Sequence, residues 1–365
     1  MNACVLIFGA GDVALQIATG LAQDTSVRRI VFAEKYPERA VDAAEMLATC
    51  AGCQVEVIGT DATDPVAVTR LLRAVRADLI VQAASIVGPW QIFGIDHPVA
   101  HALSAGGIAL QASVQLPVLL NVMRCVRELE LDTPVTNLSM PDIAHVILGR
   151  LDLAPTIGLG NVSILHLRAR AALRAKIGYP DADPDVHKEP LLRLVGHHHH
   201  VYGVMQATPP DDPAQSVCVY VGDTGERDDG LAYAGHPFPT GPIYNVITAA
   251  ASLPVIRAML PEGGDMRFSA PAPFGLPGGY PVHIRHGEIA LDLPEGVTQK
   301  DAVAFNERIS MLDGVQAIDD DGTLHYTDNA RNSVAHIDPR LAEPLNVNNV
   351  TERMALFLET IDQIG

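Results

Sequence analysis

Over the first 150 residues, short apolar runs alternate with segments whose apolar positions recur with helical spacing. This alternation is typical of repeated β-α-β units. The runs predicted as strands are residues 4–8, 29–33, 55–59, 78–85, 108–112 and 134–137. The segments predicted as helices between them are residues 13–22, 37–51, 65–75 and 117–130. Six strands joined by helices predict an α/β fold, a doubly wound parallel (Rossmann) sheet in a dinucleotide-binding domain over residues 1–150.

After residue 150 the pattern changes, because polar stretches rich in Pro and Asp interrupt it at 179–185 and 208–215. Apolar runs that predict further strands lie at 191–195, 216–221 and 288–293. Helical spacing recurs at 243–259, 300–311 and 350–364. We expect a second, α+β domain over residues 151–365 that supplies the substrate pocket and oligomer contacts. Its last helix has a spacing suited to packing against the first domain or a partner subunit.

A glycine-rich turn follows the first predicted strand and opens the first helix, with the sequence Gly9-Ala10-Gly11-Asp12-Val13-Ala14. The first glycine permits a tight turn, the second lets the backbone approach a pyrophosphate, and the third small residue lets helix and strand pack closely. The positive end of the helix dipole then faces the phosphates. The turn predicts dinucleotide binding, and a tight strand-helix turn without a nucleotide is the alternative.

Other strand ends carry the remaining candidate cofactor contacts. Glu34 ends the second strand, where a carboxylate can hold the adenine ribose diol and repel a 2′-phosphate, so NAD is favoured. Two nearby basic residues soften that preference, and NADP stays possible. Asp61 and Ala62 follow the third strand, near the expected adenine, and Ala84 and Ser85 end the fourth, where small side chains let the nicotinamide half pass. Each of these pairs can equally be a compact strand end.

An asparagine and two arginines are candidates for holding the substrate. Asn137 ends the sixth predicted strand, where its amide can donate to a substrate oxygen or to the nicotinamide ribose. Capping of the following helix is the alternative. Arg168 and Arg170 lie on a predicted helix, on roughly opposite sides. One of them can therefore clamp a substrate carboxylate while the other is solvated.

Four consecutive histidines, residues 197–200, follow an apolar run. In an extended segment at most two of them share a face. Imidazole titrates near neutrality and suits the proton transfer that accompanies hydride transfer, so His198 and His199 are candidate catalytic residues. A metal site is the competing hypothesis. Against it, adjacent histidines do not easily converge on one ion and no Cys or acidic residue has ligand spacing. A solvated or packed run is the third possibility.

The composition of the chain argues against several classes of binding partner and against disulfide bonds. The formal net charge of −18 argues against nucleic acid and anionic membranes, because no basic surface neutralises phosphates. We find no apolar run long enough to span a bilayer and no secretory leader, so we expect a cytoplasmic protein without a membrane partner. The five cysteines, an odd number in a long chain, argue against a disulfide framework.

The order of these features resembles the lactate/malate dehydrogenase-like superfamily of NAD(P)-dependent Rossmann-fold dehydrogenases. The resemblance implies that Asn137 binds the substrate, Arg168 pairs with its carboxylate, and His198 exchanges the proton. Two departures stand out: the family's Asp three residues before the arginine is Leu165 here, and the loop over residues 86–98 contains no arginine. The N-terminal domain equally resembles saccharopine dehydrogenase-type domains, which act on amino acids through imines.

Together these features predict an NAD(P)-dependent oxidoreductase that transfers a hydride between nicotinamide and a small carboxylate-bearing hydroxy or amino/imino substrate. One alternative is a non-redox enzyme, such as a cyclase, lyase or epimerase, that uses tightly bound NAD for transient oxidation. Another is a catalytically inactive dinucleotide-binding sensor, which the missing Asp before Arg168 favours. Folds of this type are commonly homodimers or homotetramers, and we expect one of these states.

Overall fold

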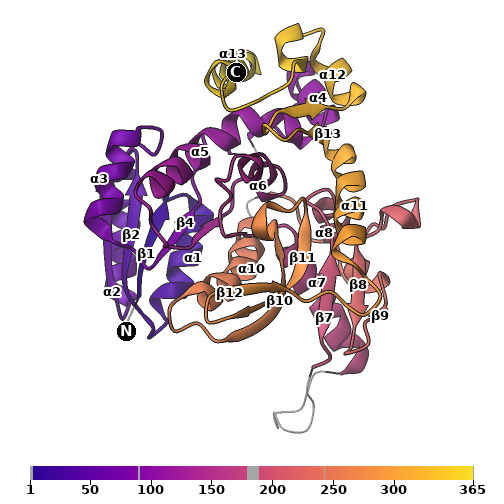
Figure 1. The fold of residues 1–365 in the computed structure, drawn as a ribbon, viewed down its shortest axis with the longest axis horizontal. Helices are drawn as coiled ribbons and strands as arrows, with labels where there is room; N and C mark the ends of the chain where they lie inside the picture. Colours follow the sequence, from indigo (N-terminus) through magenta and orange to yellow (C-terminus); the bar gives the residue numbers. More distant parts are fainter. Residues whose placement is uncertain (1–2, 89–90, 179–188, 242, 365) are drawn as a thin grey trace.

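The structure is a computed structural model that describes residues 3–88, 91–178, 189–241 and 243–364. A six-stranded sheet forms the N-terminal part, in the order β3-β2-β1-β4-β5-β6, and its neighbouring strands are parallel. The strands are β1 (Ala3–Phe8), β2 (Val27–Glu34), β3 (Gln54–Gly59), β4 (Leu79–Gln82), β5 (Val135–Asn137) and β6 (Ile157–Gly158). The order reverses beside β1, so the doubly wound α/β sheet expected from the sequence is confirmed (Figure 1).

Helices cover both faces of this sheet. They are α1 (Asp12–Ala22), α2 (Val41–Cys50), α3 (Pro65–Val75), α4 (Pro98–Ala105), α5 (Ala112–Glu128) and α6 (Pro141–Arg150). Side chains of β1 alternate between two hydrophobic cores: Leu6 packs in the core that contains α3 and α5, and Ile7 in the core that contains α1 and α2. Strand β1 is buried over its whole length, which explains its unbroken apolar sequence.

One predicted strand is wrong. Residues 108–112 form the short 3₁₀ helix Ile108–Gln111 and the first residue of α5, and the sixth strand is β6 instead. All four residues of the 3₁₀ helix are buried, so no side of the segment faces solvent. A short, fully buried run has no period that separates a strand from a buried helix.

The same segment also carries the most apolar long helix. The 3₁₀ helix and α5 together form one helical segment, Ile108–Glu128, which is the one helix of the described residues that is long and apolar enough to cross a membrane. The sequence analysis found no apolar run of that length. In its most apolar window 83% of the residues are buried inside the protein. The helix therefore serves as a core element of this fold.

The second part of the chain is α+β, as predicted. Two three-stranded antiparallel sheets in it have the orders β7-β8-β9 and β10-β11-β12. The strands are β7 (Leu192–Val195), β8 (Cys218–Val221), β9 (Glu226–Arg227), β10 (Asp265–Pro271), β11 (Gly279–Arg285) and β12 (Glu288–Leu291). The helices are α7 (Val162–Ile177), α8 (His200–Met205), α9 (Gly230–Tyr233), α10 (Tyr244–Met259) and α11 (Gln299–Ser310). The predicted loop at 179–185 lies outside the described residues.

The C-terminal segment returns to the first core. It consists of β13 (Val315–Ile318), β14 (Leu324–Tyr326), α12 (Asp328–Val334) and α13 (Val350–Ile361). Phe357 of α13 belongs to the same hydrophobic core as Leu119 of α5 (Figure 1). Of the two alternatives predicted for the last helix, the first domain or a partner subunit, the structure shows packing against the first domain. The N-terminal sheet and core thus include β6 and residues from the C-terminal end, beyond the boundary predicted at residue 150.

Candidate active site

The glycine turn lies between β1 and α1, as predicted. Gly9 has a φ of +88°, and a Cβ there would approach the backbone of Ala84 to 3.1 Å, so glycine is required on both counts. Gly11 is the N-cap of α1, and without a side chain it leaves the first N–H groups of the helix uncapped. A Cβ at this position would meet nothing within 4 Å. The first turn of α1 therefore begins beside open space at its positive end, which is the arrangement that binds an anionic pyrophosphate.

Two other residues of the turn tie α1 to its neighbours. Asp12 Oδ2 accepts hydrogen bonds from Gln16 Nε2 at 2.9 Å and from Asn245 Nδ2 of α10 at 2.7 Å. Val13 is half-buried against the core beneath α1 and α10. The carboxylate of Asp12 is thus held by two amides at the start of the helix.

Glu34 closes the turn from the end of β2. Its carboxylate accepts from the backbone N–H of Ala10 at 3.0 Å and from that of Tyr36 at 3.1 Å. Nearby, Lys35 forms an ion pair with Asp61 at 2.9 Å, which commits that lysine to a carboxylate rather than leaving it for a 2′-phosphate. Burial raises the pKa of Asp61, but hydrogen bonds from Thr63 and the Lys35 charge outweigh it, and the pKa ends below its usual value.

The remaining predicted cofactor residues also follow strand ends. Ala62 is buried after β3, and its carbonyl accepts from Asn121 Nδ2 at 2.8 Å. Ala84 and Ser85 follow β4, where Gln82 Nε2 donates to the Ala84 carbonyl at 2.8 Å. Because β3, β2, β1 and β4 are neighbours in that order, the predicted contacts form a continuous row along one edge of the sheet.

Asn137 ends β5 as predicted, but it is fully buried and its amide is committed within the protein. Its Nδ2 donates to the Ser139 carbonyl at 2.8 Å and lies 3.1 Å from His145 Nε2, while its Oδ1 accepts from Ser139 N–H at 2.9 Å. Burial lowers the pKa of His145 to about 4, so the ring is neutral and accepts from Asn137. In this structure Asn137 shapes the turn after β5 and presents no free donor.

Asp142 and Asn161 come from the turns after β5 and β6, which are neighbouring strands. Asp142 is 3% exposed, and its carboxylate accepts from Asn161 Nδ2 at 3.0 Å and from the backbone N–H of His198 at 2.6 Å. Asn161 has a φ of 42°, a conformation that costs a non-glycine residue energy and often marks a functional site. This contact joins the histidine run to the sheet edge beside the cofactor row.

The histidine run curls around one carboxylate, that of Asp313. His197 Nδ1 lies 3.2 Å and His198 Nδ1 3.0 Å from Asp313 Oδ2, and His199 Nδ1 lies 3.1 Å from Asp313 Oδ1. The His198 and His199 side chains are 35% and 40% exposed, whereas the His197 side chain is fully buried. Only these two rings combine the carboxylate contact with access to solvent.

In the histidine cluster, formed by residues 197–200 and Asp313, opposite charges shift the pKa values of His198 and Asp313. Burial lowers the pKa of His198, but the charge and hydrogen bond of Asp313, together with the charge of Asp142, raise it overall above its usual value. Burial raises the pKa of Asp313, but His198 and the hydrogen bonds from the three rings outweigh it and hold that pKa well below its usual range. An ionised Asp313 facing a protonatable His198 is the electrostatic arrangement of an acid–base pair.

Asp313 is a candidate site residue that the sequence analysis missed. It stands in the short 3₁₀ helix Met311–Asp313, after α11 and far from the histidines in sequence. The backbones of Gly314 and Gly107 fix it, because a Cβ on Gly107 would come within 2.4 Å of the Asp313 carbonyl oxygen. The contact joins residues far apart in the sequence, so no local sequence pattern could predict it.

His200 belongs to the core rather than to the accessible part of the cluster. Its Nδ1 accepts from the His197 N–H at 2.9 Å, and its Nε2 donates to the Gln215 carbonyl at 2.9 Å. Burial, with a smaller effect of the His197 charge, lowers the pKa of His200 to about 4. It is therefore neutral near physiological pH.

Arg168 lies on α7, buried to 6% exposure, and contacts the loop over residues 235–238. Its Nη2 donates to the His236 carbonyl at 2.6 Å, its guanidinium stacks 4.4 Å from the Phe238 ring centroid, and its Nε has no partner among the described residues. Arg170, on the other side of the helix, binds Glu189 through Nε and Nη2. The two arginines do face different surroundings, and neither contacts the histidine cluster directly.

Metal binding has no geometric support in the parts of the chain that the structure describes. Within residues 3–88, 91–178, 189–241 and 243–364, no group of three or more His, Cys, Asp or Glu side chains is placed to hold an ion.

Comparison with known proteins shows the fold. No protein-family model matches this sequence, and no curated protein matches it significantly. The 6-phospho-beta glucosidase from Thermotoga maritima, solved with manganese, NAD+ and glucose-6-phosphate, aligns over 100% of this chain and 99% of its own, with a TM-score of 0.55 and 13% identity. Malate dehydrogenase from Archaeoglobus fulgidus in complex with NADH aligns over 85% of this chain and 98% of its own, with a TM-score of 0.51 and 14% identity. The fold implied by the dehydrogenase resemblance is thus confirmed.

Proposed function

We propose that the chain is an NAD-dependent dehydrogenase that acts on a small carboxylate-bearing hydroxy or amino/imino substrate. This proposal rests on one observation: the predicted cofactor contacts and the histidine cluster both lie at the carboxyl ends of the strands of the parallel sheet. The row of predicted cofactor contacts runs from β3 to β4. Beyond the next strand ends, Asn161 donates to Asp142, and Asp142 accepts from the backbone N–H of His198 in the histidine cluster. Catalytic groups and cofactor meet at such an edge in folds of this kind.

The residues present suit a dinucleotide. The uncapped start of α1 and the open space at Gly11 receive the pyrophosphate, and Glu34 receives the adenine ribose beside the Ala10 N–H that it already binds. When bound, the nicotinamide supplies the hydride acceptor. Ala84 and Ser85 leave room for that half of the cofactor because their side chains are small.

His198 carries the proton in this proposal. Its Nδ1 is held by Asp313, and its Nε2 has no hydrogen-bond partner recorded among the described residues, so Nε2 is the atom that exchanges a proton with the substrate. Asp313 fixes the ring orientation and stabilises the imidazolium that forms. It takes the role of the Asp that is missing three residues before Arg168. His199, held by the other carboxylate oxygen, is the second candidate.

Arg168 is the proposed clamp for the substrate carboxylate. Its guanidinium is buried, burial lowers its pKa, and no carboxylate within the described part of the chain forms an ion pair with it. A buried charge without a counter-charge is costly. An incoming carboxylate would supply that counter-charge, bind the unpartnered Nε, and replace the His236 carbonyl at Nη2.

The cofactor assignment is tested by calorimetric titration of NAD and NADP into Gly11→Val and Gly52→Val. Both glycines have open space around the missing Cβ, so both variants are expected to fold. Only the side chain at position 11 obstructs the pyrophosphate, so we expect NAD affinity to fall about 100-fold there and to stay unchanged at position 52. Equal NAD binding by Gly11→Val and the wild type would sink the assignment.

The chemistry is tested by following the absorbance of reduced nicotinamide with hydroxy acids, amino acids and 2-oxo acids. For the substrate found, Arg168→Gln should raise KM, and His198→Ala should lower kcat about 100-fold or more. Full turnover by both His198→Ala and His199→Ala at saturating substrate contradicts the proton-transfer role. NAD binding with neither an absorbance change nor product formation would contradict the dehydrogenase assignment and favour the sensor alternative.

A non-redox enzyme that oxidises its substrate transiently with bound NAD is the second candidate. It is favoured by the full-length alignment with the NAD+-containing 6-phospho-beta glucosidase, which extends over the C-terminal segment that supplies Asp313. Such an enzyme forms product with no net change in reduced-nicotinamide absorbance. Chromatographic detection of product under those conditions distinguishes it from a dehydrogenase.

A further inference from the structure

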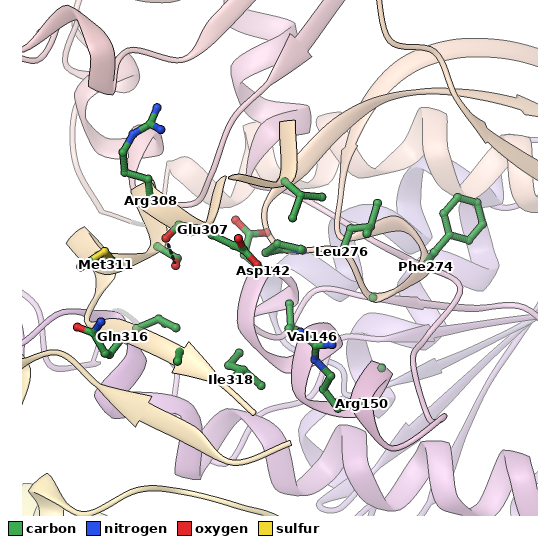
Figure 2. A pocket seen from close by; sticks show the side chains of 17 residues that line it. Asp142, Val146, Arg150, Phe274, Leu276, Glu307, Arg308, Met311, Gln316 and Ile318 are labelled. Atoms are coloured by element: carbon green, nitrogen blue, oxygen red, sulfur yellow. Dashed lines mark hydrogen bonds between the residues drawn. The ribbon is translucent and has the colours of Figure 1, made fainter. Parts of the chain in front are cut away.

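A cleft lies next to the histidine cluster, at Asp142, and the proposed reaction assigns it no ligand. It has a volume of about 600 Å³ and lies between α6, α11, β13 and the loop after β10 (Figure 2). Pockets for small ligands commonly measure about 300–1,000 Å³. The cleft reaches the cluster at Asp142, which lines its inner end and binds the His198 backbone. Its size suits a small organic molecule.

One wall of the cleft is held rigidly in a strained form. Ala272 and Phe274 have φ values of 48° and 58°, in the left-handed region that non-glycine residues rarely adopt. The Ala272 carbonyl accepts from buried His145 at 3.1 Å, which anchors the loop to α6. A Cβ on Gly149 would lie 3.4 Å from the Cα of Gly275, so the loop and the helix are already in close contact. The wall is therefore preformed.

Most of the lining is apolar. Val146, Leu276, Val303, Val315 and Ile318 contribute to it from four different segments. At the cleft, Phe274 is 57% exposed and Met311 is 44% exposed, although both are large apolar side chains. Exposed apolar side chains gathered at a cleft are typical of a ligand-binding surface. This surface suits the apolar body of a ligand.

The charged lining leaves two groups available, one on each side. Asp142 already accepts from the His198 N–H and from Asn161, and Arg308 stacks 5.4 Å from the Phe305 ring centroid. Glu307 on α11 is an exposed side chain, and it forms no ion pair among the residues that the structure describes. Arg150 on α6 pairs with Asp320 at 3.4 Å, an exposed contact of little strength. Figure 2 shows Arg150 on the opposite side of the cleft from Glu307.

We propose that this cleft binds a free α-amino acid with an apolar side chain. Arg150 receives the carboxylate, Glu307 receives the ammonium group, and the apolar lining receives the side chain. A zwitterion matches one positive and one negative wall, and it enters a chain of net charge −18 without adding net charge. The site is separate from the cofactor row, so the inference stands whether or not the dehydrogenase assignment holds.

The test is calorimetric titration with three probes that share one aromatic body: L-phenylalanine, 3-phenylpropionate and phenethylamine. The dinucleotide is left out. We expect saturable binding of one L-phenylalanine per chain, with the anion and the cation each bound about tenfold more weakly, because each loses one of the two charge contacts. Arg150→Gln and Glu307→Gln should each weaken L-phenylalanine binding about tenfold. Arg124→Gln, at an exposed arginine of α5 outside the cleft, should leave it unchanged.

Ala317→Trp locates the site. Ala317 lines the cleft but is exposed, so the larger side chain fills the cleft without entering the core. Loss of L-phenylalanine binding with unchanged NAD binding supports the proposal. Binding that persists in Ala317→Trp, tighter binding of either singly charged probe, or no saturable binding of L-phenylalanine to the wild type overturns it.

Discussion

At the scale of single residues, the reactivity of the histidine run depends on one carboxylate. Asp313 contacts three imidazole rings, yet only His198 and His199 are accessible. Because the pKa of Asp313 lies well below its usual range, the carboxylate is ionised throughout the range in which imidazoles titrate. Asp313 therefore determines at which pH His198 releases its proton.

Asp313→Asn should move that pH downward. The wild-type His198 pKa is raised above 6.5, and an amide keeps a hydrogen-bond acceptor but removes the charge that raises it. We expect the His198 titration, followed by NMR of the imidazole carbon protons, to shift to lower pH. The acidic limb of kcat/KM should shift equally. Asp328→Asn, at an exposed carboxylate, is the control, and an unshifted His198 in Asp313→Asn contradicts this account.

At the scale of elements, the short strands β5 and β6 position the polar side chains that the histidines need. Gly158 ends β6 and lies so close to its surroundings that a Cβ would come within 2.6 Å of Pro141 Cβ and 2.8 Å of the Pro271 carbonyl. Pro141 begins α6 directly before Asp142, and Asn161 follows β6. The close packing at Gly158 therefore sets the distance between the two turns.

Gly158→Ala should destabilise the protein, although alanine usually reduces backbone freedom favourably. Neither neighbour is a flexible side-chain end, so the strand has to move, at a cost of about 1–3 kcal/mol. Gly52→Ala, where a Cβ meets nothing within 4 Å, should change stability by less than about 0.5 kcal/mol. Urea unfolding of both variants gives the comparison. Equal stability of Gly158→Ala and the wild type would show that the turns are not set by this contact.

At the scale of the whole molecule, three histidines are buried in the neutral form. Burial lowers the pKa of His145 and His200 to about 4 and that of His166 to about 3, from 6.5 in an exposed ring. Between these values the unfolded chain binds more protons than the folded one, so stability decreases as pH falls below 6.5. His198 acts in the opposite direction, because its raised pKa stabilises the fold below 6.5 and that stabilisation is lost as pH rises through the folded pKa.

The net effect should be acid lability. As pH falls from 7.5 to 5.5, each buried histidine should lower the free energy of unfolding by about 1.4 kcal/mol. Because His198 offsets part of this sum, we expect the free energy of unfolding to fall by about 3 kcal/mol in total. Urea unfolding at the two pH values measures this. His166→Gln should reduce the dependence by about one histidine's share, whereas His336→Gln, at an exposed ring, should leave it unchanged. A free energy that is constant or higher at pH 5.5 would rule out neutral buried histidines.

The sequence by itself determined the sheet and its cofactor edge. Alternation of apolar runs and helical segments gave five of the six strands, and the turn at Gly9 and the strand end at Glu34 lie where predicted, because backbone geometry and burial act on neighbouring residues. The prediction of a strand at 108–112 was wrong because a short segment buried on all sides has no period that distinguishes a strand from a helix. Only the tertiary structure brought Asp313 to the histidine run and buried Arg168 without a carboxylate partner among the described residues. Those contacts join segments far apart in the chain, and packing of whole elements, rather than any local pattern, decides which side chains meet.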